Sequence, residues 1–431
     1  MGRVTFSGAA VALAGLLVLV GAPAQPSFAQ EPATVALTGA RVIDGTGADP
    51  IEGATVLIAD GRIRAVGAAG DVSIPDGAER VDVSGKTIIP GLINAHAHLN
   101  DGDPALPLHD QLLGQLRLYA DYGVTTIHTL GDDGVESVRV RDAQARGERL
   151  DRARLYVSGP NVVAETAEEA RRSIDEVADL GVDIIKTRLN AQPGDMTPEV
   201  YGALIDQAHR RDLRVAAHLI DLDDAKGLLA AGVDVVAHSV RDQDVDQELI
   251  DELIRLDVGY IPTLTRCLSV FLYETTPAFF DDPFFLRGAD AYRSDMEEIR
   301  DPATHERVRN SETAQFTKQM IEQAKRNIKL LTDGGATIAM GTDSGTSLGR
   351  WQGYFEHVEL ELMVESGMTP MQVLVAATGN GARVMRLDDL GTLEPGKWAD
   401  LVVLGANPLD DITNTRAIDS VWIAGRRLGA E

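Results

Sequence analysis

The middle of the chain alternates short apolar segments with longer helical patterns, and this alternation restricts the possible folds more than any other feature. Strands that alternate with helices form βαβ units and parallel sheets. A glycine after a helical pattern, as at Gly181, Gly232 and Gly335, favours a left-handed cap before the next strand. Eight such units over about 250 residues predict an α/β fold, a (β/α)8 TIM barrel. The predicted strands are Thr87–His98, Val124–Leu130, Arg154–Ser158, Val182–Lys186, Arg214–His218, Val233–His238, Gly259–Thr263 and Thr337–Thr342.

Both ends of the chain carry shorter strand patterns. Ala54–Ile58 and Arg62–Val66 are separated by Asp60-Gly61, a spacing that is typical of a hairpin. Ala399–Leu404 and Ser420–Ile423 form a similar pattern near the other end of the chain. We therefore predict a small β-sandwich domain made from both chain ends, residues 30–86 and 385–431, around a barrel of residues 87–384.

The first 29 residues have the three parts of a secretory signal peptide. Arg3 supplies a positive charge, residues 9–20 are almost continuously apolar, and Ser27-Phe28-Ala29 offers small residues to signal peptidase. A membrane anchor is the alternative interpretation, but this apolar run is shorter than the roughly 20 residues of a membrane span. We expect cleavage after Ala29, a periplasmic or secreted protein, and no membrane association after cleavage.

The composition narrows the classes of partner. Apolar residues make up 44% of the chain, which is ordinary for a globular protein and argues against disorder. The formal net charge is −26, which disfavours binding to nucleic acid or to anionic membranes. We interpret the charge as a solvated acidic surface. The sequence leaves a homo-oligomer open.

One long segment does not fit the repeating pattern. Residues 265–312 are too long for a simple connection between a strand and a helix, and they are rich in Phe, Tyr, Asp and Pro. We interpret them as a lid or a substrate-shaping insertion. The single cysteine, Cys267, lies here among apolar residues, so a buried structural thiol is favoured over a nucleophile.

Chemically active side chains gather at the ends of the predicted strands, where active sites of such barrels lie. Alternate residues of a strand share one face, so the two histidines of His96-Ala97-His98 can bind one metal ion. Imidazole and carboxylate ligands suit zinc and similar divalent ions. The full set at strand ends is His96, His98, Lys186, His218, His238 and Asp343.

Each of these residues alone has an ordinary explanation. Chance pairs such as His96 and His98 are common, His218 alone is more often a buried core histidine, and Lys186 alone can be a solvated strand end. Their expected convergence on one face of the barrel favours a functional site over separate structural roles.

The motifs resemble those of the amidohydrolase superfamily, in particular its imidazolonepropionase-like and Xaa-Pro dipeptidase-like branch. The resemblance covers most of residues 34–428 and is weakest from 265 to 312. After Lys186 the sequence departs from dipeptidase-like members, because it lacks their glycine-rich continuation. The matching stretches are IIPGLINAHAHL (88–99), YGVTTIHTLGD (122–132), GVDIIKT (181–187), VAAH (215–218), GVDVVAHS (232–239), GTDSG (341–345), GMTPMQVLVAAT (367–378) and LGTLEPGKWADLVVL (390–404).

The resemblance implies a role for each strand-end residue. His96, His98 and Asp343 would bind one divalent metal ion, with zinc the preferred metal, and His218 and His238 would bind a second. Lys186 would carry a carboxylated ε-nitrogen (N6-carboxylysine) that bridges both ions. Asp343 would also act as the general base toward a metal-activated hydroxide and pass its proton to the leaving nitrogen.

The sequence then leaves several functions open. The first is hydrolysis of an amide bond in a small molecule such as a dipeptide, an N-acyl amino acid or a related conjugate. The second is opening of a lactone or of a cyclic amide of the imidazolone type. The third is a non-catalytic metal-binding barrel, and a one-metal site with unmodified Lys186 is a further variant. Three residues are predicted to contact substrate: Arg188, which would hold a carboxylate, His128 and Tyr260.

Overall fold

The computed structural model describes Gly2, residues 34–99 and residues 105–429. The predicted signal peptide, residues 1–29, lies outside the described residues apart from Gly2. The described residues other than Gly2 belong to one compact unit that begins at Ala33. None of the helices in the described ranges is long and apolar enough to cross a membrane.

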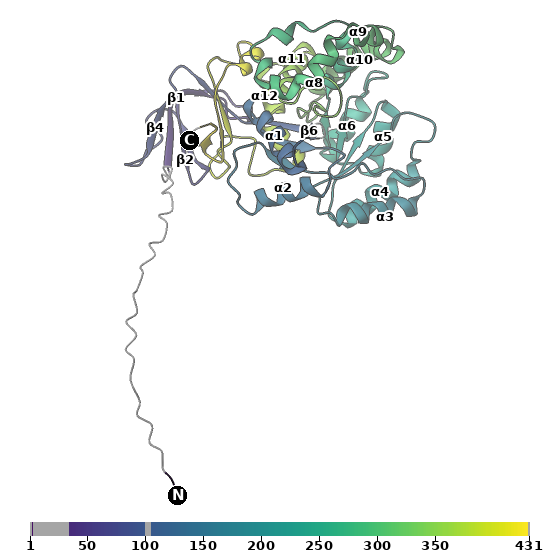
Figure 1. Cartoon of the computed structure of the whole chain (residues 1–431), viewed down its shortest axis with the longest axis horizontal. Helices are drawn as coiled ribbons and strands as arrows, with labels where there is room; N and C mark the ends of the chain where they lie inside the picture. Colours follow the sequence, from purple (N-terminus) through teal and green to yellow (C-terminus); the bar gives the residue numbers. More distant parts are fainter. Residues whose placement is uncertain (1, 3–33, 100–104, 430–431) are drawn as a thin grey trace. The chain divides into compact units, whose positions relative to one another are not determined.

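The two ends of this unit meet in one eight-stranded sheet (Figure 1). Its order is β15-β14-β13-β5-β1-β2-β3, and β4 pairs with β1. The predicted hairpin is confirmed, since β2 pairs antiparallel with β3 around Asp60 and Gly61, which both have positive φ. The strands are β1 (Thr34–Val42), β2 (Ile51–Ala59), β3 (Arg62–Gly67), β4 (Glu79–Asp82), β5 (Thr87–Pro90), β13 (Leu401–Leu404), β14 (Ile418–Ile423) and β15 (Arg426–Arg427).

Seven parallel strands form the centre of the α/β part. They make two sheets, one of three strands and one of four. A bridge between Val162 and Thr187 joins the two sheets at one side. The first sheet contains β6 (Leu92–Ala97), β7 (Val124–Thr129) and β8 (Arg154–Tyr156), and the second contains β9 (Ile185–Arg188), β10 (Val215–His218), β11 (Val235–Ala237) and β12 (Gly259–Ile261).

The segment predicted as an eighth strand, Thr337–Thr342, connects the other two edges through isolated bridges. Ile338 pairs with Tyr260 in β12, and Ser344 pairs with Ala97 in β6, both in parallel orientation. The backbone N–H of Ala95 also donates to the carbonyl of Met340 at 2.9 Å. This segment therefore links the edge of the second sheet at β12 to the edge of the first sheet at β6.

The prediction of one continuous strand over Thr87–His98 is wrong, because the structure has two strands there. Its first part is β5, which pairs with β1 and β13 in the eight-stranded sheet, and its second part is β6. Gly91 separates them at a close approach, because a Cβ atom there would lie 2.0 Å from the Thr125 hydroxyl oxygen. The chain therefore changes sheets at Gly91.

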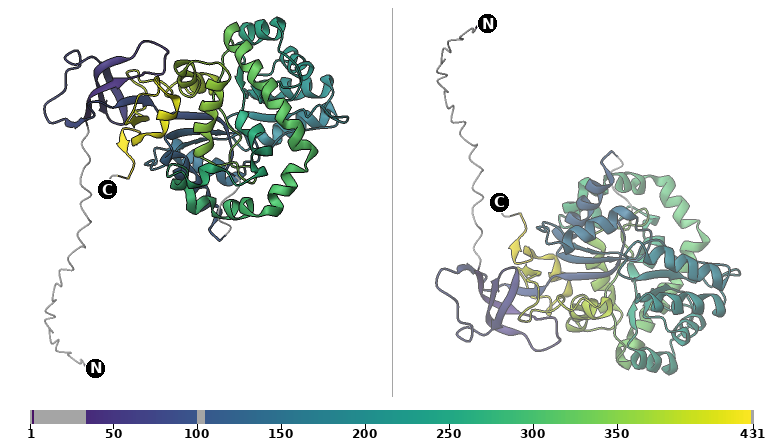
Figure 2. Two further views of the ribbon diagram at one scale, coloured as in Figure 1. Left: turned by 90° about the horizontal axis from the view of Figure 1, so that it is seen from above. Right: turned by 90° about the horizontal axis from the view of Figure 1, so that it is seen from below.

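Helices cover the parallel strands on the outside (Figure 2). Capping side chains fix several of the helix starts: Thr166 accepts from Glu169 N, Asp221 from Asp224 N, and Asp246 from Leu249 N. The predicted left-handed caps at Gly232 and Gly335 are present. The helices are α1 (Leu108–Asp121), α2 (Val135–Ala145), α3 (Ala167–Ala178), α4 (Pro198–Arg210), α5 (Leu222–Ala231), α6 (Gln247–Leu256), α10 (Glu312–Gly334), α11 (Tyr354–Glu365), α12 (Pro370–Ala376) and α13 (Gly379–Met385).

Residues 265–312 are largely helical and pack through aromatic side chains. Phe285 stacks with Phe280 and lies edge-on to Trp351 and Tyr354, at centroid distances of 5.3, 5.1 and 5.0 Å. Cys267 is buried, as predicted. The segment contains most of α7 (Leu264–Phe271), then η1 (Leu272–Glu274), η2 (Ala278–Asp281), η3 (Phe285–Gly288), α8 (Ala289–Arg300), α9 (Pro302–Arg309) and the N-cap of α10.

Candidate metal centre

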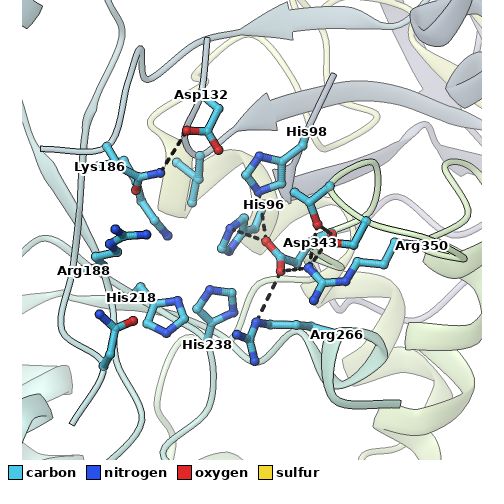
Figure 3. A pocket seen from close by; sticks show the side chains of 15 residues that line it. His96, His98, Asp132, Lys186, Arg188, His218, His238, Arg266, Asp343 and Arg350 are labelled. Carbon is cyan, nitrogen blue, oxygen red and sulfur yellow. Dashed lines mark hydrogen bonds and ion pairs between the residues drawn. The ribbon is translucent and has the colours of Figure 1, made fainter. Parts of the chain in front are cut away.

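One pocket of about 250 Å³ lies at the carboxyl ends of the parallel strands (Figure 3). The structure brings all six predicted strand-end residues to this pocket. His96 lies in β6, Lys186 in β9 and His218 in β10. His98 and His238 directly follow β6 and β11, and Asp343 lies in the segment that bridges to β12 and β6. The six are His96, His98, Lys186, His218, His238 and Asp343.

Three side chains form a compact, buried group of potential metal ligands. Oδ1 of Asp343 lies 3.1 Å from Nε2 of His96 and 2.9 Å from Nε2 of His98. One ligand atom from each residue lies within 4.8 Å of the other two. The His-Ala-His spacing thus does bring both imidazoles to one point.

A second pair of imidazoles lies beside the first group. The ring of His238 is 4.5 Å from that of His96 and 4.3 Å from that of His218, measured between centroids. Nδ1 of His238 is 2.6 Å from the hydroxyl oxygen of Thr263, which fixes the ring orientation. The four histidines therefore form one continuous row.

Burial disfavours the protonated form of three of these histidines. Loss of hydration lowers the pKa of His96 to about 3, and it holds the pKa values of His218 and His238 well below that of a free imidazole. A neutral imidazole has the free lone pair that a metal ion requires. The protonation state of these residues therefore suits ligation.

Lys186 is also buried, and its ammonium form is disfavoured. Burial lowers the pKa of Lys186 to about 7. Its Nζ atom has no hydrogen-bond partner among the described residues. An amine at this position is therefore present in both charged and neutral forms near neutral pH, and the neutral form has a lone pair that is free to react.

Asp343 is held on both of its carboxylate oxygens. Oδ1 faces the two histidines, and Oδ2 accepts a hydrogen bond from Arg350 and lies 3.4 Å from Nε of Arg266. Burial alone would raise the pKa of Asp343, but Arg350 and the two histidines outweigh it and hold that pKa well below the usual range. Asp343 is therefore ionised.

The backbone around the pocket is strained at four positions. Asp132, His238, Thr263 and Asp343 have φ angles of 67°, 87°, 50° and 60° although none is glycine. Each such residue costs on the order of 1–3 kcal/mol and persists only where the surroundings hold it in place. Strain of this kind clusters at functional sites, which agrees with the position of the pocket.

Two buried glutamates on α11 supply part of that support. Oε1 of Glu356 accepts hydrogen bonds from Asn94 Nδ2 at 2.6 Å, Ser344 Oγ at 2.8 Å and Thr342 Oγ1 at 3.0 Å. Glu359 accepts from the backbone N–H groups of Leu264 and Thr265, at 2.8 and 2.7 Å. One helix therefore fixes the segments on both sides of Asp343 and the start of α7.

Of the three residues predicted to contact substrate, one lines the pocket and two do not. Arg188 lines the pocket. His128 and Tyr260 do not: His128 is buried against Tyr156, and the Tyr260 hydroxyl accepts a hydrogen bond from the Val240 N–H inside the apolar core. Both side chains are fully buried against other protein groups, so the prediction that they contact substrate is not supported.

Several residues that line the pocket were not predicted from the sequence. Asp132 and Asn190 each follow a strand by two or three residues, and this position is a signal that could have indicated them. Arg266 and Arg350 carried no such signal, because they come from α7 and from the loop before α11. The additional lining residues are Leu130, Asp132, Asn161, Asn190, Arg266, Thr346, Ser347 and Arg350.

Fold and pocket together define an α/β protein with a buried His-His-Asp group at the carboxyl ends of parallel strands. Residues 87–428 match the amidohydrolase family, so the chain belongs to this family, whose members are hydrolases. An imidazolonepropionase from Streptomyces avermitilis is 25% identical over 405 residues, covering 89% of each chain. A solved structure from Bifidobacterium longum has a TM-score of 0.76 at 29% identity, covering 93% of this chain and 95% of that one. A Xaa-Pro dipeptidase with bound methionine has a TM-score of 0.72 at 21% identity, with coverage of 91% and 99%.

Proposed function

We propose that this protein is a metal-dependent hydrolase that cleaves an amide bond in a small substrate, such as a dipeptide, an N-acyl amino acid or a related conjugate. The observation that carries the proposal is the convergence of His96, His98, Lys186, His218, His238 and Asp343 on one pocket. The fold shared with a Xaa-Pro dipeptidase supports it further.

The proposal includes the architecture around the pocket. We propose a (β/α)8 barrel of residues 87–384, supported by the parallel pairings within the two sheets and by the isolated bridges that link them. Residues 30–86 and 385–431 would form the accompanying β-sandwich domain, supported by the sheet that their strands share.

The residues present fit two divalent metal ions, with zinc preferred. His96, His98 and Asp343 would hold one ion, and His218 and His238 would hold the other. The lowered pKa values of His96, His218 and His238, and the lack of a hydrogen-bond partner for Lys186 Nζ within the described ranges, support this fit.

Lys186 would bridge the two ions after carboxylation. Its neutral amine attacks carbon dioxide, an N–C bond forms, and the nitrogen releases one proton to give an anionic carbamate. The carbamate would offer anionic oxygen ligands to the ions in place of an ammonium group that two dications would repel. Because the pKa of Lys186 is about 7, part of its side-chain amine is neutral at physiological pH, which supports carboxylation.

When bound, the ions lower the pKa of water and polarise the substrate carbonyl. Asp343 then accepts a proton from the attacking water and delivers it to the leaving nitrogen, so that the carboxylate is restored. Arg350 and Arg266 hold Asp343 in position on the side away from the histidines. Arg188, which lies exposed at the end of β9, would hold a substrate carboxylate.

A second candidate function is the opening of a cyclic amide or lactone at the same site. The similarity to an imidazolonepropionase favours it. Comparing the turnover of imidazolones and lactones with that of N-acyl amino acids separates the two candidates, because hydrolysis of a linear amide gives two separate products and ring opening gives one.

The direct test is a hydrolysis screen of protein loaded with zinc or manganese, against dipeptides and N-acyl amino acids. We expect release of an amino acid from at least one class. Inactivity across the whole set, together with absence of bound metal, would favour a non-catalytic barrel and contradict the proposal.

A further inference from the structure

Arginine side chains line the pocket on two opposite sides. Arg188 lies on one side of His218 and His238, and Arg266 and Arg350 lie on the other (Figure 3). Building on the proposed function, we propose that the site selects amides with one anionic group on the acyl side and one on the amine side of the scissile bond. The substrate class is thus a dicarboxylic acid joined by one carboxyl group to an amino acid.

The pocket lining suits a small and highly polar molecule. Among the described residues that line it, only Leu130 has an apolar side chain. Its volume of about 250 Å³ lies below the roughly 300–1,000 Å³ of pockets for drug-sized ligands. An apolar acyl chain or a long peptide would find few matching contacts here.

Arg266 has donors left for a substrate. A guanidinium offers five N–H donors. Arg266 approaches Asp343 only through Nε, at 3.4 Å, and the hydrogen bonds found in the described part of the chain use neither of its Nη groups. About a quarter of its side chain is exposed. The fork of Nη donors is therefore open to a carboxylate.

Arg350 differs from Arg266, because its Nη1 and Nε donors are already used within the protein. It donates to Asp343, to Thr346 Oγ1 at 2.6 Å, and through Nε to Ser269 Oγ at 3.2 Å. Arg350 thus serves to position Asp343, and Arg266 is the residue on this side that recognises the second anion.

Arg188 supplies the opposite pole. It is exposed, ends β9 two residues after Lys186, and takes part in no ion pair among the residues that the structure describes. A scissile carbonyl placed between Arg188 and Arg266 would have one arginine toward its acyl side and one toward its amine side. Two recognised anions follow from this placement.

Four matched compounds test the inference. N-succinyl-alanine carries both anions, N-succinamoyl-alanine and N-succinyl-alaninamide carry one each, and N-succinamoyl-alaninamide carries none. We expect kcat/KM for N-succinyl-alanine to exceed that of either single-anion compound by roughly tenfold or more, the scale of a lost charge-assisted hydrogen bond. Release of alanine or alaninamide is measured by chromatography.

Variants assign each preference to its arginine. Arg188→Met and Arg266→Met should each erase one of the two preferences, whatever their effect on the overall rate, because the readout is a ratio between compounds. Arg293→Met, an exposed arginine on α8, serves as the control and should keep both preferences. Melting curves confirm that each variant is folded.

The outcomes separate this inference from the proposed function. If the amides are hydrolysed but N-succinyl-alanine shows no advantage, the inference fails and the proposed function stands. If none is hydrolysed, the hydrolysis screen decides the proposed function separately, and calorimetric binding of the same four compounds to the metal-loaded protein decides the two-anion inference. Equal affinities would then overturn the two-anion site.

Discussion

The residues of the pocket combine reactive side chains with surroundings that set their charge. Burial lowers the pKa values of His96, His218, His238 and Lys186, whereas Asp343 stays ionised because Arg350 and two imidazoles stabilise its carboxylate. Neutral ligands and an ionised base are thereby favoured together, which is a pattern expected at a functional site. Local sequence patterns do not reveal this environment, since Arg266 comes from α7 and Arg350 from the loop before α11.

Replacing the proposed base tests its role most simply. In Asp343→Asn the side chain keeps its size but cannot accept the proton, so we expect kcat to fall roughly 100-fold to 10,000-fold. Asp132→Asn is the matched control, because Asp132 lines the same pocket without belonging to the ligand set. A wild-type kcat in Asp343→Asn would rule out the assignment.

Buried histidines also predict how stability depends on pH. The pKa values of His128 and His357 are lowered by burial to about 3, below the value near 6.5 of an unfolded histidine. The unfolded state therefore binds protons that the folded state excludes, so these residues cost stability as the pH falls from about 6.5 toward 3.

We expect the free energy of unfolding in urea to be smaller at pH 5 than at pH 7.5. His357→Gln should reduce this difference, whereas replacement of the more exposed His305 should not. An equal pH dependence in His357→Gln and wild type would contradict the account.

At the scale of elements, α11 links the site to the rest of the fold. Glu356 and Glu359 lie one turn apart on this helix and reach two different strand-end segments. The sequence YFEHVELEL offers no sign of this role, because acidic residues on a helix usually face water. The strands themselves were predictable from their apolar runs, but the change of sheets at Gly91 was not, since it depends on contact with Thr125.

Removing the Glu356 carboxylate should destabilise the protein. Glu356→Leu removes the buried acceptor that Asn94, Thr342 and Ser344 share, which we expect to cost about 2 kcal/mol in the free energy of unfolding. Glu356→Gln keeps a carbonyl oxygen and should recover much of the loss. Equal stability of the Leu variant and wild type, measured by urea unfolding, would show that the network is not supportive.

For the whole molecule, the strand-end motifs allowed both the family and the six convergent residues to be anticipated. The segment 265–312 was recognised as unusual, but its aromatic packing against Trp351 and Tyr354 involves partners that local patterns do not reveal. The interpretation of the net charge as an acidic surface and the predicted export both come from the sequence.

Export predicts a defined cleavage. When the full chain is expressed in a bacterium with a secretory pathway, mass spectrometry of the periplasmic or secreted protein should show an N-terminus at Gln30. Ala29→Asp, which removes the small residue at the cleavage site, should block processing. Recovery of the uncleaved wild-type chain from the cytoplasm would contradict the proposal.

The measurement that tests the central claim most directly is elemental analysis of the purified chain and of two variants. The account predicts two divalent metal ions per chain, loss of one in Lys186→Ala, and retention of both in Lys226→Ala, whose lysine lies on α5 outside the pocket. A wild-type protein that binds no metal after incubation with zinc or manganese and bicarbonate would contradict it.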